Sequence, residues 1–139
     1  MNSIHFRQQI IGSFVFALAG LGVAGCTPDS GRYIVSGKVT FQGQPVEEGT
    51  VTFEDPAAGQ VNSSPLTSGG AYAMELPAGD FRVSVSPPLV ETKAGPDTPG
   101  DMVPKKVANI PAKYHRQETS GHSAKVESGK TEFNFDLKP

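Results

Sequence analysis

A single thiol is the most distinctive reactive group in this chain. Cys26 is the only cysteine among the 139 residues, and it directly follows Val23, Ala24 and Gly25. A lone cysteine cannot form a disulfide within the chain, and most often it packs as a small buried hydrophobe. Here, however, the thiol directly follows an uncharged, largely apolar run that ends in small residues. Its position therefore makes Cys26 the first candidate for chemistry in this chain.

The residues before Cys26 have the layout of a secretory signal peptide. A polar start that carries Arg7 leads into an uncharged, largely apolar run that ends at Gly25. The run covers about 16 residues, or ~24 Å as a helix, whereas a bilayer core of ~30 Å needs about 20 apolar residues. We therefore predict that residues 1–25 are a cleaved signal peptide. An ordinary signal without lipid and an uncleaved anchor are the alternatives.

The segment Val23-Ala24-Gly25-Cys26 resembles the lipobox of bacterial lipoproteins. The resemblance implies cleavage between Gly25 and Cys26, attachment of lipid to the Cys26 sulfur, and acylation of the new amino terminus with chains such as palmitate. Two or three chains anchor a protein stably, because each buried CH₂ adds about 0.8 kcal/mol. Thr27 follows the cysteine, where an aspartate favours inner-membrane retention in enterobacteria. The predicted location is therefore the cell envelope, with the outer membrane favoured over the inner.

The remainder of the chain is predicted to be a short tether, residues 26–32, followed by one all-β domain over residues 33–138. Apolar side chains recur at every second position, which is typical of half-buried strands. The predicted strands cover residues 33–41, 49–54, 71–76, 80–86, 123–127 and 131–137. The strongest local pattern predicts a hairpin of residues 71–76 with 80–86, in which Gly79 takes a positive φ. Short strands separated by frequent turns favour an antiparallel sandwich or barrel.

Two stretches lack this alternation. Residues 55–64 contain Pro56 and Gly59 and are predicted to be a loop. The proline-rich segment Pro87–Pro111 is longer than most loops in compact domains, so it is either functional or mobile. It could also cover an edge strand, because exposed edges invite pairing with other chains.

The other groups that could do chemistry do not form a recognisable site. His115, Glu118 and His122 do not have zinc-binding spacing and lie in a glycine-containing loop, so we interpret them as solvated loop residues. The sequence contains no Gly-x-Ser-x-Gly nucleophile motif, and its formal net charge of −2 offers no basic stripe for nucleic acid. We therefore predict no enzyme activity, no metal or other cofactor, and no nucleic-acid partner.

Several motifs together resemble the carboxypeptidase regulatory-like (transthyretin-like) domain, in the short lipoprotein form found in planctomycete bacteria. The resemblance covers about residues 33–138 and is carried by the following segments: Val35-Ser36-Gly37-Lys38-Val39-Thr40-Phe41, Gly43-Gln44-Pro45-Val46, Gly49-Thr50-Val51-Thr52-Phe53, Gly70-Ala71-Tyr72, Pro77-Ala78-Gly79-Asp80-Phe81-Arg82-Val83, Ile110-Pro111-Ala112-Lys113-Tyr114 and Phe133-Asn134-Phe135-Asp136-Leu137. It implies an antiparallel seven-stranded β-sandwich, transthyretin-like or immunoglobulin-like. It does not imply peptidase activity, because the catalytic zinc domain is absent from this chain.

Most aromatic side chains fall on predicted inward faces and are assigned to the core. Tyr114 is the exception, because it follows Pro111 outside any predicted strand. Its ring either caps the sandwich or offers a surface contact. The predicted function is a non-enzymatic lipoprotein whose sandwich supports contacts with a protein partner or envelope structure. The alternative is a small-ligand or carbohydrate-binding module around Tyr114 and the Pro87–Pro111 segment.

Overall fold

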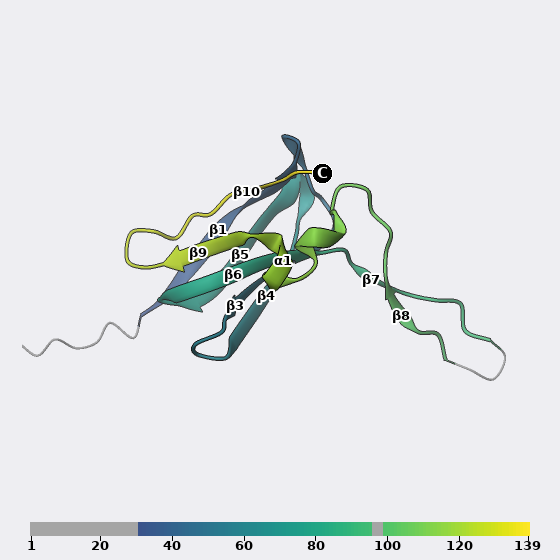
Figure 1. The fold of residues 1–139 in the computed structure, drawn as a ribbon, viewed down its shortest axis with the longest axis horizontal. Helices are drawn as coiled ribbons and strands as arrows, with labels where there is room; N and C mark the ends of the chain where they lie inside the picture. The colour runs from purple at the N-terminus through teal and green to yellow at the C-terminus, as the bar shows by residue number, and fades with distance from the viewer. Residues whose placement is uncertain (1–30, 96–98) are drawn as a thin grey trace, which may run out of the picture.

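A computed structural model describes residues 31–95 and 99–139. The predicted signal peptide, the cleavage site between Gly25 and Cys26, and most of the predicted tether lie outside this range. The described chain is mostly β-structure, with ten strands in three sheets (Figure 1). Helical structure within these residues is limited to η1 (Ser68–Gly70), η2 (Ala112–Tyr114) and α1 (Gln117–Ser120). The all-β prediction is therefore confirmed, while ten strands are more than the seven expected.

The first sheet is built around β1 (Arg32–Phe41), which begins at the last residue of the predicted tether. β5 (Ala71–Pro77) and β2 (Gln44–Pro45) run antiparallel to β1. β1 and β2 are joined through Gln42 and Gly43, which both have positive φ (50° and 80°), as the tightest hairpin turns require. β10 (Phe135–Leu137) runs parallel to β1, with Val39 opposite Phe135. The prediction of wholly antiparallel pairing is wrong at this position.

The second sheet has the order β4-β3-β6-β9, and all of its pairings are antiparallel. Its strands are β4 (Gln60–Pro65), β3 (Thr50–Asp55), β6 (Gly79–Ser86) and β9 (His122–Val126). β4 occupies the second half of the segment 55–64 that was predicted to be a loop, so the prediction is wrong for residues 60–64. The strand is polar even on its inner face, where the buried Ser64 hydroxyl donates to the Ala73 carbonyl at 3.1 Å. Apolar alternation could not reveal it.

The predicted hairpin of residues 71–76 with 80–86 is also wrong. β5 pairs with β1, whereas β6 pairs with β3 and β9, so Pro77-Ala78-Gly79 carries the chain from one sheet to the other. Gly79 is not among the glycines with positive φ. A Cβ at Gly79 would instead come within 2.9 Å of the Asp55 carboxylate, so close packing favours glycine here.

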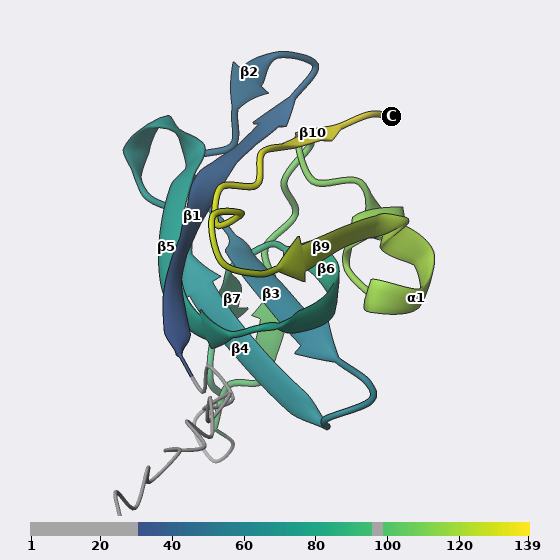
Figure 2. The same cartoon turned by 90° about the vertical axis from the view of Figure 1, so that its left-hand side faces the viewer.

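The inner faces of the two sheets share one hydrophobic core in a sandwich-like arrangement (Figure 2). Phe53 of β3 is fully buried at its centre. Its ring centroid lies 5.8 Å from Tyr72 of β5, 6.0 Å from Phe81 of β6 and 6.1 Å from Phe135 of β10. Aromatic pairs at these separations stabilise a core beyond the area that they bury. The core aromatic cluster therefore joins strands from both sheets.

The C-terminal segment is fixed on β1 by a close backbone contact. Gly37 has no side chain, and a Cβ at this position would overlap the Phe133 carbonyl oxygen that crosses it. The same oxygen accepts a 2.7 Å hydrogen bond from the Tyr72 hydroxyl. At the next residue, the Lys38 amide donates to the Asn134 side chain at 2.8 Å. The close contact with Phe133 explains why a glycine occupies position 37 within β1.

Part of the Pro87–Pro111 segment forms a two-stranded antiparallel hairpin that projects from the body of the domain (Figure 1). Its strands are β7 (Leu89–Glu91) and β8 (Met102–Pro104). We call residues 88–95 and 99–105 the arm. Within the described residues these two strands pair only with each other. The arm therefore does not cover an edge of either larger sheet.

Candidate interaction surface

The predicted modification site cannot be placed in this structure, because Gly25 and Cys26 lie outside the described residues. The apolar run that precedes them also lies outside. Within residues 31–95 and 99–139, no helix is long and apolar enough to cross a membrane. Lipidation of Cys26 remains a prediction from the sequence.

Tyr114 belongs to the core and not to the surface. Its side chain is buried, and its hydroxyl accepts a 2.9 Å hydrogen bond from the Lys138 amide. The ring stacks on His122 with centroids 5.2 Å apart, and the Lys113 ammonium lies 5.1 Å from the ring centroid. The expectation of a surface contact at Tyr114 is therefore wrong, and the ring caps the core. The reason is that η2 folds this residue back over the end of the sheets.

The three candidate metal ligands make separate contacts, and the prediction that all three are solvated loop residues is wrong for His122, which lies in β9. His115 Nε2 is 3.0 Å from the Ile110 carbonyl oxygen, and Glu118 is exposed on α1. His122 stacks between Tyr114 and Phe135, and its buried Nε2 atom makes no hydrogen bond to the described residues. Burial lowers the pKa of the His122 imidazole, while Asp136 opposes this effect and Lys113 adds to it. The described residues contain no group of three or more residues that could hold a metal ion.

A polar cleft of about 680 Å³ lies where the C-terminal segment separates from β1. Thr40 and the Gly43 amide donate to one carboxylate oxygen of Asp136, at 2.8 and 3.2 Å. These hydrogen bonds, led by that from Thr40, lower the pKa of Asp136. Asn134 is likewise held, by Lys38 and Glu132. These hydrogen bonds tie the C-terminal segment to β1 and to the turn after it, on one side of the cleft.

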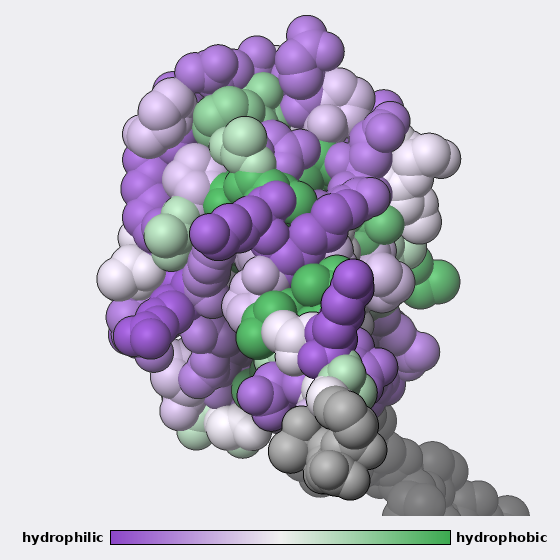
Figure 3. Space-filling model, turned by 90° about the vertical axis from the view of Figure 1, so that its right-hand side faces the viewer, coloured by the Kyte–Doolittle hydropathy of each residue, from purple (hydrophilic) through white to green (hydrophobic). Residues whose placement is uncertain are grey.

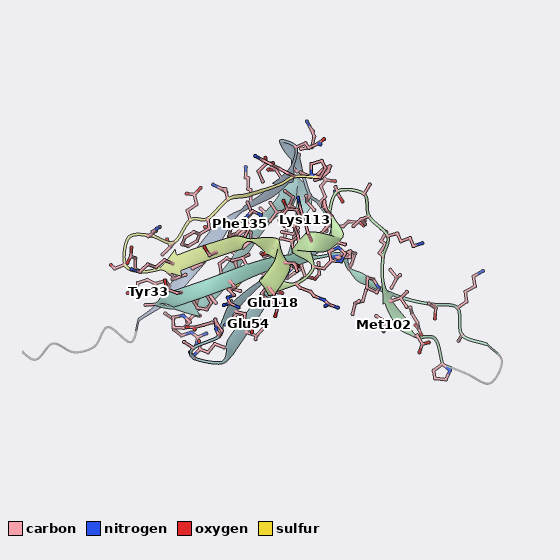
Figure 4. All side chains as sticks on the ribbon, viewed as in Figure 1. Tyr33, Glu54, Met102, Lys113, Glu118 and Phe135 are labelled. Carbon is pink, nitrogen blue, oxygen red and sulfur yellow. The ribbon has the colours of Figure 1, made fainter. Side chains whose placement is uncertain are left out.

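The arm carries the main exposed apolar surface of the described residues. Four of the six large hydrophobic side chains that are exposed lie on it, with exposed fractions as follows: Leu89 58%, Val90 40%, Met102 59% and Val103 37%. Figure 3, which faces the end of the molecule that bears the arm, shows hydrophobic side chains gathered there among polar ones. Figure 4 shows Met102 on the arm at the opposite end of the long axis from Tyr33 at the start of β1. Leu89 and Met102 lie on one face of the hairpin and Val90 and Val103 on the other, and exposed apolar side chains gathered on one element mark a candidate contact site.

The base of the arm is fixed to the body. Lys105 forms an ion pair with Glu48 of the body. Within the arm, the Lys105 amide closes the hairpin by donating to the Pro88 carbonyl at 2.8 Å. Two grooves flank this base. A largely apolar groove of about 560 Å³ is lined on one side of the base by residues that include Pro104, Val107 and Ile110. Another, of about 440 Å³, lies between Leu89 and the outer face of β3. The arm is therefore a positioned element and not a free loop.

Sequence reasoning missed the arm because its strands are only three residues long. The sequence does contain one signal for a hairpin here. Two pairs of adjacent hydrophobic residues, Leu89-Val90 and Met102-Val103, flank a stretch that contains Gly95 and Gly100. Strands of three residues do not show enough alternation to be detected by period. The exposure of these side chains is a property of the folded molecule and could not be read from their types.

Comparisons with known proteins identify no family for this chain. No family model matches the chain, and no curated protein matches it. The structure is similar to that of BcpA, the major pilin subunit of Bacillus cereus, with 12% sequence identity and a TM-score of 0.42. That match covers 76% of this chain and 29% of the pilin. A likeness this distant carries no argument about function, and the resemblance to the carboxypeptidase regulatory-like domain stays a prediction.

Proposed function

We propose that this protein is a membrane-anchored bacterial lipoprotein whose non-catalytic β domain makes protein–protein contacts through the arm. Its lipid anchor is Cys26, and its location is the cell envelope, with the outer membrane favoured over the inner. The two large sheets, without β2 and the arm, form the seven-stranded sandwich of a carboxypeptidase regulatory-like domain. The observation that carries the proposal is the exposed apolar arm.

The position of the arm supports a role in contact with another protein. The described chain begins at one end of the long axis, and the arm projects from the other end (Figure 1). Between Cys26 and β1 lie residues 27–31, which span about 18 Å at most when fully extended. A lipid on Cys26 therefore holds the start of β1 close to the bilayer. The arm is therefore far from the anchored end (Figure 1), where contact with another protein does not compete with the anchor.

The arrangement gives less support to a carbohydrate-binding module. Such sites present exposed aromatic rings in a concave surface, but Tyr114, the aromatic residue expected to serve there, is buried. The core aromatic rings of Phe53, Tyr72, Phe81 and Phe135 pack on one another. The exposed side chains on the arm are aliphatic or methionine, which suits packing against another protein better than stacking on a sugar.

Anchoring is tested by mass spectrometry of the full chain extracted from bacterial membranes. We expect a mature amino terminus at Cys26 and a mass increase that corresponds to two or three fatty chains. The Cys26→Ser variant should leave the membrane fraction or accumulate as uncleaved precursor. A free thiol at Cys26, or a mature terminus elsewhere, would contradict the anchoring part of the proposal.

A further inference from the structure

We propose that the arm joins two copies of this chain, by antiparallel pairing of β7 with β7 of a second copy around Val90. The inference rests on the proposed function, because it names the partner of the arm. It makes the contact a continuous four-stranded sheet in the order β8-β7-β7-β8. The partner is therefore identical to the chain that it binds.

The two outer edges of the arm differ in their capacity to accept another strand. Thr92 donates from its amide to Asp101, and Lys105 donates to Pro88, at 2.8 Å each. Val90 lies opposite Val103 between these two bonds. The backbone groups of Val90, like those of Thr92, therefore point toward β8, and those of the residues in between point away from it. Pro104 therefore faces outward on β8, where it has no N–H to donate. The outer edge of β8 is closed to regular pairing.

The outer edge of β7 is open by the same reasoning. Leu89 and Glu91 alternate with the inward-facing residues, so their N–H and C=O groups point away from β8. Both residues are exposed, and among residues 31–95 and 99–139 β7 pairs with β8 alone. An edge strand with unpaired groups and apolar side chains is a template for addition of another strand.

The residues on this edge select one register. Pairing centred on Glu91 would set two like charges opposite each other, which destabilises a sheet. Pairing centred on Leu89 would set Pro87, which has no N–H, opposite Glu91. Registers centred further along need Lys93, which lies beyond the end of β7 at Glu91. Pairing centred on Val90 avoids all three problems, because each Leu89 then bonds to the partner's Glu91.

This register also aligns the valines of the two arms. Val90 lies opposite Val103 within the hairpin, so two copies paired at Val90 place four valines in one row across the new sheet. Their exposed fractions of 40% and 37% are surface that neighbouring strands can cover. β-branched cross-strand neighbours each contribute about 0.2–1 kcal/mol. The arm is thus complementary to itself, as a two-fold symmetric interface requires.

The contact area is small, so the membrane is part of the assembly. Interfaces below about 1,000 Å² in total are weak between free proteins. Antiparallel β7 strands place the two bodies on opposite sides of the pair, so the copies share one bilayer with their arms lying along it. The lipid anchors then raise the effective concentration of one copy for the other. The test is therefore made on the full chain in native membranes and not on a soluble fragment.

Disulfide crosslinking distinguishes this register from others. Val90 and the partner's Val90 form a non-hydrogen-bonded pair, with Cα atoms about 4.5 Å apart, which lies within the range that a disulfide spans. We expect membranes that contain Val90→Cys, treated with a mild copper oxidant, to give a dimer that a reducing agent dissociates. Thr92→Cys is the matched control on the same strand and face, and it should give little dimer. Adding Leu89→Pro to Val90→Cys should abolish the crosslink, because it removes an outer-edge donor without affecting the hairpin ladder.

The outcomes separate this inference from the proposed function. A lipidated Val90→Cys chain that gives no dimer overturns pairing between arms and leaves the lipoprotein proposal intact. A stronger crosslink from Thr92→Cys than from Val90→Cys overturns the register. A dimer from the unmodified chain would mean that Cys26 carries a free thiol, which overturns the lipid anchoring on which the inference rests. Circular dichroism of each variant serves as the folding control.

Discussion

Two antiparallel valine pairs show how the body of the domain differs from the arm. Val51 and Val85 face each other on β3 and β6, and Val90 and Val103 face each other on β7 and β8. The first pair is completely buried under the opposite sheet, whereas the second keeps exposed fractions of 40% and 37%. Full burial of a valine side chain contributes about 1.5–3 kcal/mol. The arm obtains this stabilisation only when a partner covers it.

The comparison indicates a division of roles between the two regions. The body has aromatic rings from both sheets in contact, and the Gly37, Tyr72 and Phe133 contact fixes its C-terminal strand. The arm is held at its base by Lys105 and is otherwise a two-stranded hairpin. Such a hairpin is only marginally stable by itself. Substitutions in the body should therefore change the free energy of unfolding, and substitutions in the arm should change association.

The largest expected effect is at the centre of the core. Phe53→Ala removes the ring that contacts Tyr72, Phe81 and Phe135, and it should lower the free energy of unfolding by about 3–5 kcal/mol. Met102→Ala on the arm should change it by less than about 0.5 kcal/mol. Urea denaturation followed by circular dichroism measures both values. A comparable loss in the two variants would show that the arm belongs to the cooperative core.

The matched valines give a smaller and sharper test. Val85→Ala leaves a cavity between the sheets and should destabilise the fold by about 2 kcal/mol. Val90→Ala should fall within about 0.5 kcal/mol of the unmodified chain, because the side chain is exposed. Urea denaturation measures both variants, and equal midpoint concentrations of urea would contradict this expectation. Both substitutions shorten a valine that faces another valine across an antiparallel pair, so the difference in unfolding free energy reports the burial that the opposite sheet provides.

The smallest expected effect concerns pH. Burial lowers the pKa of His122 below its usual 6.5, so the unfolded chain binds the proton more readily than the folded one. The stability that neutral His122 contributes is present above pH 6.5 and is lost as the pH falls through the folded pKa. Replacing it by phenylalanine keeps the stack with Tyr114 and Phe135 and should reduce the loss of stability between pH 7 and pH 5. Melting temperatures across this range measure it, and an unchanged slope would contradict the assignment.

Alternation along the chain predicted much of the body but not how its strands assemble. The inward faces of β1, β3, β5 and β6 follow from apolar residues at every second position, and these strands lie close to their predicted ranges. Alternation of apolar residues shows which side chains of a strand are buried, but not which sheet the strand joins. Pro77-Ala78-Gly79 therefore has the sequence of a hairpin turn although it connects two different sheets.

The candidate surface was even less accessible to sequence reasoning. β4 has polar residues on its inner face, and β7 and β8 are too short to show a period. Tyr114 was correctly recognised as lying outside the strands, but only the fold of η2 decides that its ring is buried. In each case tertiary packing, and not local propensity, determines the outcome.

A photoreactive side chain tests most directly the claim that the arm carries the contacts. The probe replaces Leu89 on the arm or Val61 on the edge strand β4, two positions whose side chains are exposed to 58% and 60%. On irradiation of intact cells, we predict that the probe at position 89 gives a covalent adduct of twice the mass of the chain and that the probe at position 61 gives none. Equal adducts from both positions, or none from position 89 in a chain shown to be lipidated, would contradict the account.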